Sequence, residues 1–182
     1  MIQEMDLSIL LWIQEHLRME PLTAVLKVIT FLGDAGWFWI ALAILLICFK
    51  KTRPAGTAAL LSLALGALCT NVILKNVIAR IRPYDVCQAL TPLIAKPTDF
   101  SFPSGHTCAS FASALIYIRT FPKKYGILLM VLAVLIAFSR LYVGVHYPSD
   151  VVGGALVALF ASTVVWHFMK GYFLVSDKKG EE

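Results

Sequence analysis

The segment from His146 to Asp150 has residue types that can form a nucleophile and its orienting group. His146 comes just before Pro148, and we predict Ser149 as the N-cap of the following helix, with Asp150 in its first turn. A carboxylate across so tight a turn can hold one imidazole nitrogen as a donor and leave the other nitrogen free to attack. The alternative is structural, a helix cap beside a hydrogen-bonded histidine.

Lys75 and Arg82 form a basic pair suited to an anion. They are seven residues apart, so two turns of a continuous helix place them on one face, while Arg80 points elsewhere. We expect Pro83 to end that helix directly after Arg82. The planar guanidinium of arginine can bind two phosphate oxygens, and lysine adds a point charge. The pair therefore predicts a phosphate site.

The bases in this part of the chain outnumber the acids that could neutralise them. The bases are Lys75, Arg80, Arg82 and Arg140, and the acids are Asp85, Asp99 and Asp150. A positive excess remains, and it suits a bound anion. The alternative for any single base is that its side chain extends to the polar interface of a membrane.

The sequence from Ser104 to His106 could add an anion cradle and a titratable group. A Ser-Gly pair that opens a helix offers a hydroxyl, unpaired backbone N–H groups and the positive end of the helix dipole. The alternative is an ordinary N-cap at Ser104 followed by a turn residue at Gly105. His106 beside them favours chemistry, whereas His16 and His167 have no such companions and are expected to be structural.

The composition places these groups in a membrane protein. Of the 182 residues, 59% are apolar and 15% are charged, and the mean hydropathy is +0.77. So little polar surface cannot enclose a core in water. Disorder, a collagen-like fibre and a disulfide-stapled secreted module are excluded by composition.

The apolar runs predict an all-α, polytopic membrane helical bundle forming a single domain over residues 1–182. Five runs are expected to span the membrane: residues 36–49, 55–79, 106–117, 126–145 and 151–175, so the transmembrane core covers residues 36–175. Residues 1–34 show amphipathic stripes on both sides of Pro21, which predicts two interfacial helices. A sixth span over residues 21–32 is the alternative.

Three basic clusters set the expected orientation. They are Lys50, Lys51 and Arg53; Arg119, Lys123 and Lys124; and Lys170, Lys178 and Lys179. An alternating path of five helices places them on one side, which the positive-inside rule makes cytoplasmic. The segments around Lys75–Arg82, Ser104–His106 and His146–Asp150 then face the extracytoplasmic side of the membrane. The N-terminus lies outside with five spans and inside with six.

The cysteines and the net charge of +5 predict neither a metal site nor a nucleic-acid partner. Cys48, Cys69, Cys87 and Cys108 lack the paired spacing of a zinc site. Only Cys87 and Cys108 could become oxidised together on the outside. The positive excess is dispersed over loops and one pocket, with no continuous basic face for nucleic acid.

Together the chemistry-bearing segments resemble the type 2 phosphatidic acid phosphatase superfamily of membrane lipid phosphatases. The resemblance consists of Lys75, six residues and Arg82-Pro83; Pro103-Ser104-Gly105-His106; and Ser139-Arg140, five residues, His146, three residues and Asp150. All three motifs match without departure, and the similarity covers about residues 60–159. Three separated motifs in order are a specific signal.

The resemblance implies a role for each motif residue. His146 would be the nucleophile that forms a phosphohistidine, Asp150 would orient it, and His106 would be the general acid and later the base. The phosphate would be bound by a further set of residues, namely Lys75, Arg82, Ser104, Gly105 and Arg140. The family works without a metal or cofactor, so none is expected here.

The resemblance implies a lipid phosphate as the substrate, in the bilayer of a bacterial inner membrane. Similarity to short bacterial members favours undecaprenyl diphosphate, with phosphatidylglycerophosphate or phosphatidic acid as the alternatives. A non-catalytic phospholipid-binding or transport protein is the remote alternative, since a binder needs the bases but has no use for two histidines and an oriented carboxylate. The oligomeric state stays open.

Overall fold

The computed structural model describes residues 2–178, and every regular element within them is a helix. Lys179 of the third basic cluster lies outside these residues. The elements are α1 (Ile2–His16), α2 (Glu20–Leu32), η1 (Asp34–Gly36), α3 (Trp37–Ile47), α4 (Arg53–Ala67), η2 (Leu68–Leu74), α5 (Lys75–Ile78), α6 (Pro83–Val86), α7 (Gly105–Thr120), α8 (Lys123–Tyr142) and α9 (Pro148–Lys178). The prediction of an all-α fold is confirmed.

Helix α7 is the centre of the bundle. It packs against α8, α9 and α4, and its Ala112, Ala114, Ile116 and Tyr117 are completely buried. Small residues let the helices approach closely, as is typical of membrane bundles. At Gly154 of α9, for instance, a Cβ atom would lie 2.5 Å from the Ser104 carbonyl oxygen. Close packing there fixes the start of α7 against the start of α9.

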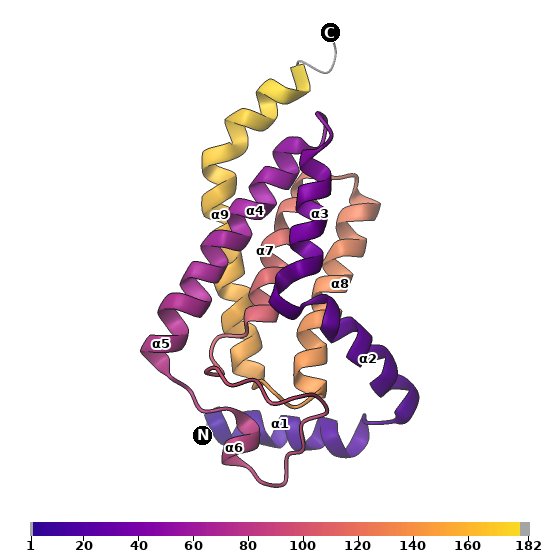
Figure 1. Ribbon diagram of the computed structural model, residues 1–182, viewed down its shortest axis with the longest axis vertical. Helices are drawn as coiled ribbons and strands as arrows, with labels where there is room; N and C mark the ends of the chain where they lie inside the picture. Colours follow the sequence, from indigo (N-terminus) through magenta and orange to yellow (C-terminus); the bar gives the residue numbers. More distant parts are fainter. Residues whose placement is uncertain (1, 179–182) are drawn as a thin grey trace.

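Helix α1 lies across one end of the bundle, beside α6 and the long 87–104 loop (Figure 1). Its buried side carries Asp6, Leu10 and Ile13, whereas Met5 and Trp12 are exposed. This two-sided pattern agrees with the predicted interfacial helix.

Helix α2 follows a different course from the one predicted. It packs against α8 rather than lying flat with α1, and a bend of 46° joins it through η1 to α3. Helix α3 has only 11 residues, too few to span a membrane alone. The bent pair α2–α3 is therefore the form in which this part of the chain could cross.

Fewer helices are long and apolar enough to span a membrane than the five or six that the sequence predicts. Within residues 2–178 three helical segments qualify, Arg53–Val86, Lys123–Tyr142 and Pro148–Tyr172, and a fourth is added if the bent pair counts as one span. Helix α7, expected to span, has 16 residues. The prediction of a multi-pass membrane bundle holds, but the count of five or six is not confirmed.

The turns α3–α4 and α7–α8 and the C-terminal end of α9 share one end of the bundle, opposite α1, α6 and the long loop (Figure 1). These turns carry the basic clusters at residues 50–53 and 119–124. The long loop and the starts of α7 and α9, which carry the candidate site residues, lie toward the opposite end (Figure 1).

Candidate active site

His146 and Asp150 meet across the α8–α9 turn as the sequence predicts. The Nδ1 atom of His146 lies 3.3 Å from Oδ2 of Asp150, and both side chains are buried. The turn closes because Gly144 adopts a positive φ of 78°. Helix α9 begins at Pro148 rather than after Ser149, so Ser149 is not the N-cap. Asp150 itself accepts the backbone N–H of Tyr147 at 2.9 Å.

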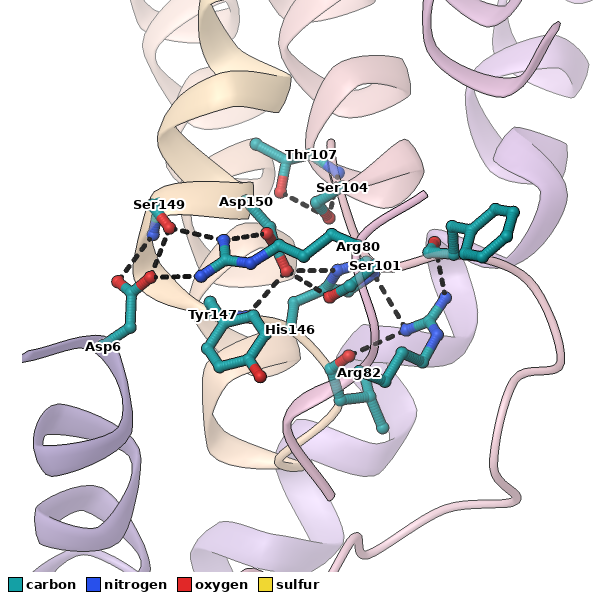
Figure 2. Close-up of polar contacts among 12 residues, drawn as sticks. Asp6, Arg80, Arg82, Ser101, Ser104, Thr107, His146, Tyr147, Ser149 and Asp150 are labelled. Carbon is teal, nitrogen blue, oxygen red and sulfur yellow. Dashed lines mark hydrogen bonds and ion pairs between the residues drawn. The ribbon is translucent and has the colours of Figure 1, made fainter. Parts of the chain in front are cut away.

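Asp150 is held by more donors than the sequence suggested (Figure 2). Besides His146 and Tyr147, it accepts from the hydroxyl of Ser101 and from Nη1 of Arg80, the latter at 2.6 Å. Four donors on its two oxygens hold the Asp150 carboxylate in one orientation. It therefore fixes the imidazole of His146 with Nδ1 as the donor.

The other nitrogen of His146 is left as an acceptor. Its Nε2 lies 3.4 Å from Nη1 of Arg82, and the side chain borders a cavity. Burial lowers the pKa of His146 to about 4, with Arg82 and Arg140 acting in the same direction and Asp150 opposing them. The ring is therefore neutral at pH 7, with a lone pair available to attack an electrophile.

Arg80 and Asp6 are two site residues that sequence reasoning missed. Arg80 was expected to point away, but its guanidinium bridges Asp150 and Asp6, with Nη2 2.8 Å from Oδ2 of Asp6 (Figure 2). Asp6 also accepts the backbone N–H of Ser149 at 3.1 Å. The interfacial helix α1 is thus connected to the carboxylate that orients His146.

Lys75 and Arg82 do converge, but not by the helical geometry predicted. Helix α5 ends at Ile78, because Ala79 adopts a positive φ of 47°, and the chain is extended at Arg82. Pro83 starts the short helix α6 instead of ending a long one. The two bases meet through a shared partner rather than through a shared helical face.

That partner is Asp99 of the long loop. One carboxylate oxygen of Asp99 pairs with Nζ of Lys75 and the other lies 2.5 Å from Nη2 of Arg82. Burial tends to raise the pKa of Asp99, but Lys75 and Arg82 outweigh it and lower the pKa to about 2. Asp99 therefore remains an anion at neutral pH and engages both bases.

Arg140 retains unused hydrogen-bonding capacity. Its side chain is 2% exposed, Nη1 donates to Oγ1 of Thr30 at 2.6 Å, and Nε has no partner among the described residues. A buried donor without an acceptor is costly unless a ligand supplies one. Arg140 borders the same cavity as Lys75, Arg82 and His146.

The start of α7 brings His106 to the cavity, with Gly105 beside it. Ser104 is the N-cap, and its buried hydroxyl accepts from the backbone N–H of Thr107 at 3.4 Å. Ser104 is thus an N-cap, and its part in binding phosphate stays a prediction. Nε2 of His106 lies 2.8 Å from Oδ1 of Asp34, a residue that the sequence did not single out.

The cavity has a volume of about 510 Å³ and two kinds of wall. Its charged and imidazole side chains are Lys75, Arg82, Asp99, His106, Arg140 and His146, and its apolar side chains include Ile40, Leu60 and Leu63. The apolar residues come from α3 and α4, within the bundle. The space can therefore accept a ligand with an anionic head and an apolar tail.

Among residues 2–178 no group of three or more His, Cys, Asp or Glu side chains is placed to hold a metal ion. The positive charge at the site comes from arginine and lysine. All four cysteines are free thiols, including Cys87 and Cys108.

Known proteins resemble this chain in sequence and in structure. An undecaprenyl-diphosphatase of Sulfolobus acidocaldarius is 38% identical over 134 residues, which are 72% of this chain and 65% of that protein, just under two thirds of its length. The bacitracin transport permease protein BcrC of Bacillus licheniformis is 32% identical over 143 residues, 76% of this chain and 69% of that protein.

A solved structure shows the same fold. The transmembrane PAP2 type phosphatidylglycerolphosphate phosphatase of Bacillus subtilis superposes with a TM-score of 0.76 at 32% identity, covering 93% of this chain and 87% of that one. The sequence pattern of the PAP2 superfamily matches residues 55–173, well over half of the chain and including all three motifs. The chain belongs to the PAP2 superfamily.

Proposed function

We propose that the protein is a metal-independent phosphatase of a membrane lipid phosphate, with undecaprenyl diphosphate as its substrate. The observation that carries the proposal is one cavity in which buried bases and a neutral, oriented histidine lie at the polar end and apolar side chains of α3 and α4 form the other wall. A lipid phosphate has this same division into an anionic head and an apolar tail.

In the proposed reaction, Nε2 of His146 attacks phosphorus and the bond to the leaving oxygen breaks. His106 gives a proton to that oxygen, so that undecaprenyl phosphate departs and the phosphoryl group remains on His146. His106 then takes a proton from water, which attacks phosphorus and breaks the P–N bond to release phosphate. Arg140 and Arg82 stabilise the negative charge on the phosphoryl oxygens.

Arginine and lysine would here do what a metal ion does in other phosphatases. The three fixed cations Lys75, Arg82 and Arg140 border the cavity, and two of them are guanidinium groups that can each bind two oxygens. The transport named for the Bacillus licheniformis relative is the second candidate function. The pairing of His146 with Asp150 favours chemistry, because transport requires no oriented imidazole.

The basic clusters support an extracytoplasmic site. The clusters at residues 50–53 and 119–124 lie at the end of the bundle opposite the one where α1, α6 and the long loop gather (Figure 1). By the positive-inside rule that basic end faces the cytoplasm. The substrate head would then meet the cavity at the outer surface of the membrane.

Purified protein in detergent with a chelator present is expected to release phosphate from lipid phosphates. We expect kcat/KM for undecaprenyl diphosphate to exceed that for phosphatidylglycerophosphate and phosphatidic acid by at least about tenfold, a difference of ~1.4 kcal/mol in transition-state binding. Orthovanadate should inhibit all three reactions. A higher value for phosphatidylglycerophosphate would move the assignment to the substrate of the Bacillus subtilis neighbour, and chelator-sensitive turnover would contradict metal independence.

Asp99→Asn is expected to strengthen inhibition by anions. The Asp99 carboxylate engages Lys75 and Arg82, the two cations that a phosphate would bind. Because the Asp99 side chain is 52% exposed, the effect should be moderate: an inhibition constant for orthovanadate lower by about tenfold, ~1.4 kcal/mol. Since the pKa of Asp99 is about 2, the effect should persist unchanged from pH 5 to pH 8.

The matched control for this variant is Asp85→Asn, an exposed acid of helix α6 on the same side of the molecule. It removes the same charge without touching the two bases. An unchanged or higher inhibition constant in Asp99→Asn would show that Asp99 does not compete with the anion.

A further inference from the structure

We infer that Asp34 is a positioning residue for His106, holding that imidazole in the orientation it needs as the general acid. The inference rests on the proposed function, because it concerns the leaving-group step of that reaction. Asp34 precedes the region matched by the PAP2 superfamily, residues 55–173, so the family pattern does not include it.

The contact itself is short and direct. Oδ1 of Asp34 lies 2.8 Å from Nε2 of His106, which makes this the second pair of histidine and aspartate at the cavity. A carboxylate accepts a hydrogen bond and cannot donate one when it is ionised. Nε2 therefore carries a proton toward Asp34, and Nδ1 is the nitrogen that exchanges a proton with the leaving oxygen.

The backbone around Asp34 is shaped to bring it to His106. The break between α2 and α3 contains two successive residues with positive φ, Ala35 at 50° and Gly36 at 68°. A positive φ at alanine is unfavourable and persists where the surroundings require it, which is common at functional sites. Gly33 lies against the imidazole so closely that a Cβ atom there would be 2.7 Å from Cδ2 of His106.

The charges around His106 explain why a carboxylate is needed there. Burial lowers the pKa of His106 to about 2, and the neighbouring cations Arg140, Lys75 and Arg82 act in the same direction, so the protonated imidazole is disfavoured. Asp34 is the carboxylate in direct contact with the ring. A neighbouring anion stabilises the imidazolium and so helps His106 to hold the proton that it must donate.

The test compares leaving groups in Asp34→Asn. An alkyl oxygen needs a proton to depart, whereas p-nitrophenolate departs without one. General acid catalysis contributes roughly 10²–10⁴-fold. We therefore expect loss of the orientation of His106 to lower kcat/KM for phosphatidic acid, an alkyl phosphate, by about 30-fold or more. The value for p-nitrophenyl phosphate should fall by no more than about threefold. The ratio kcat/KM is the correct measure because it reports on steps up to departure of the leaving group.

Three further variants make the result unambiguous. Asp34→Glu should recover part of the activity toward the alkyl substrate, since it restores the charge, and Asp85→Asn should leave both values unchanged. His106→Asn should show the same discrimination between leaving groups as Asp34→Asn. Normal activity of Asp34→Asn toward p-nitrophenyl phosphate would also demonstrate that the variant folds.

Two results would overturn the inference. If Asp34→Asn lowers both substrates equally, or lowers neither, while His106→Asn discriminates between them, Asp34 does not position the general acid and the proposed function stands. If His106→Asn itself fails to discriminate, the general-acid role of His106 is wrong and the role of Asp34 falls with it.

Discussion

His146→Ala is expected to lower phosphate release from the lipid substrate by at least about 10³-fold, since removal of a nucleophile leaves only the contributions of binding and electrostatic stabilisation. His146 is the neutral imidazole at the cavity whose Nδ1 is fixed by Asp150 and whose Nε2 is not protonated. The measurement is the rate of inorganic phosphate release at saturating substrate.

The matched control is His167→Ala. His167 is an exposed histidine of α9 that does not border the cavity. It should retain the activity of the unmodified protein. Turnover by His146→Ala at a rate near that of the control would exclude His146 as the nucleophile.

Arg140→Lys is expected to lower kcat/KM by about 10²–10³-fold, the range found when one oxyanion-stabilising donor is removed. Lysine keeps the charge but loses the planar fork, including the Nε donor that has no partner among the described residues. In the unmodified protein, the hydrogen bond from Nη1 of Arg140 to Thr30 fixes the guanidinium at the cavity. A fixed donor stabilises the transition state without reorganisation.

Arg119→Lys is the control for this variant. Arg119 lies at the other end of α7, where its Nη1 is 3.4 Å from the Ser162 carbonyl oxygen, and the change should leave kcat/KM unaltered. If Arg140→Lys retained more than about a third of kcat/KM, a loss below ~0.7 kcal/mol, a point charge would suffice and the fork would have no catalytic role.

The sequence predicts the parts of the site that depend on short-range spacing. His146 and Asp150 are four residues apart on one turn, so their contact follows from local geometry. Ser104 is likewise an N-cap that its neighbours define. Lys75 and Arg82 lie together at the cavity, but not for the expected reason, because a left-handed residue at Ala79 breaks the helix that was expected to align them.

The contacts that were missed join segments distant in the sequence. Asp6 reaches Arg80 across 74 residues, and Asp34 reaches His106 across 72 residues. Hydrophobic periodicity predicts which face of a helix is buried but not which acid meets which base. One signal for Asp34 was present, an acid between Gly33 and Gly36 in an otherwise apolar stretch.

The helical runs were predictable from the sequence, but the number of spans that they form is not confirmed. Long apolar stretches specify helices, as α4, α8 and α9 confirm. They do not specify a bend such as that between α2 and α3, which depends on the backbone at residues 33–36 and on packing against α8.

The central claim is a phosphoryl group carried on His146, and trapping it is the most direct measurement. In His106→Asn, p-nitrophenyl phosphate should still phosphorylate the protein, while loss of the base slows hydrolysis of the intermediate. Quenching ³²P-labelled reactions in alkali, where phosphohistidine is stable, and locating the label by mass spectrometry should place it on His146. No label should remain in the double variant His106→Asn/His146→Ala. Label on any other residue, or turnover with no labelled protein, would contradict the account.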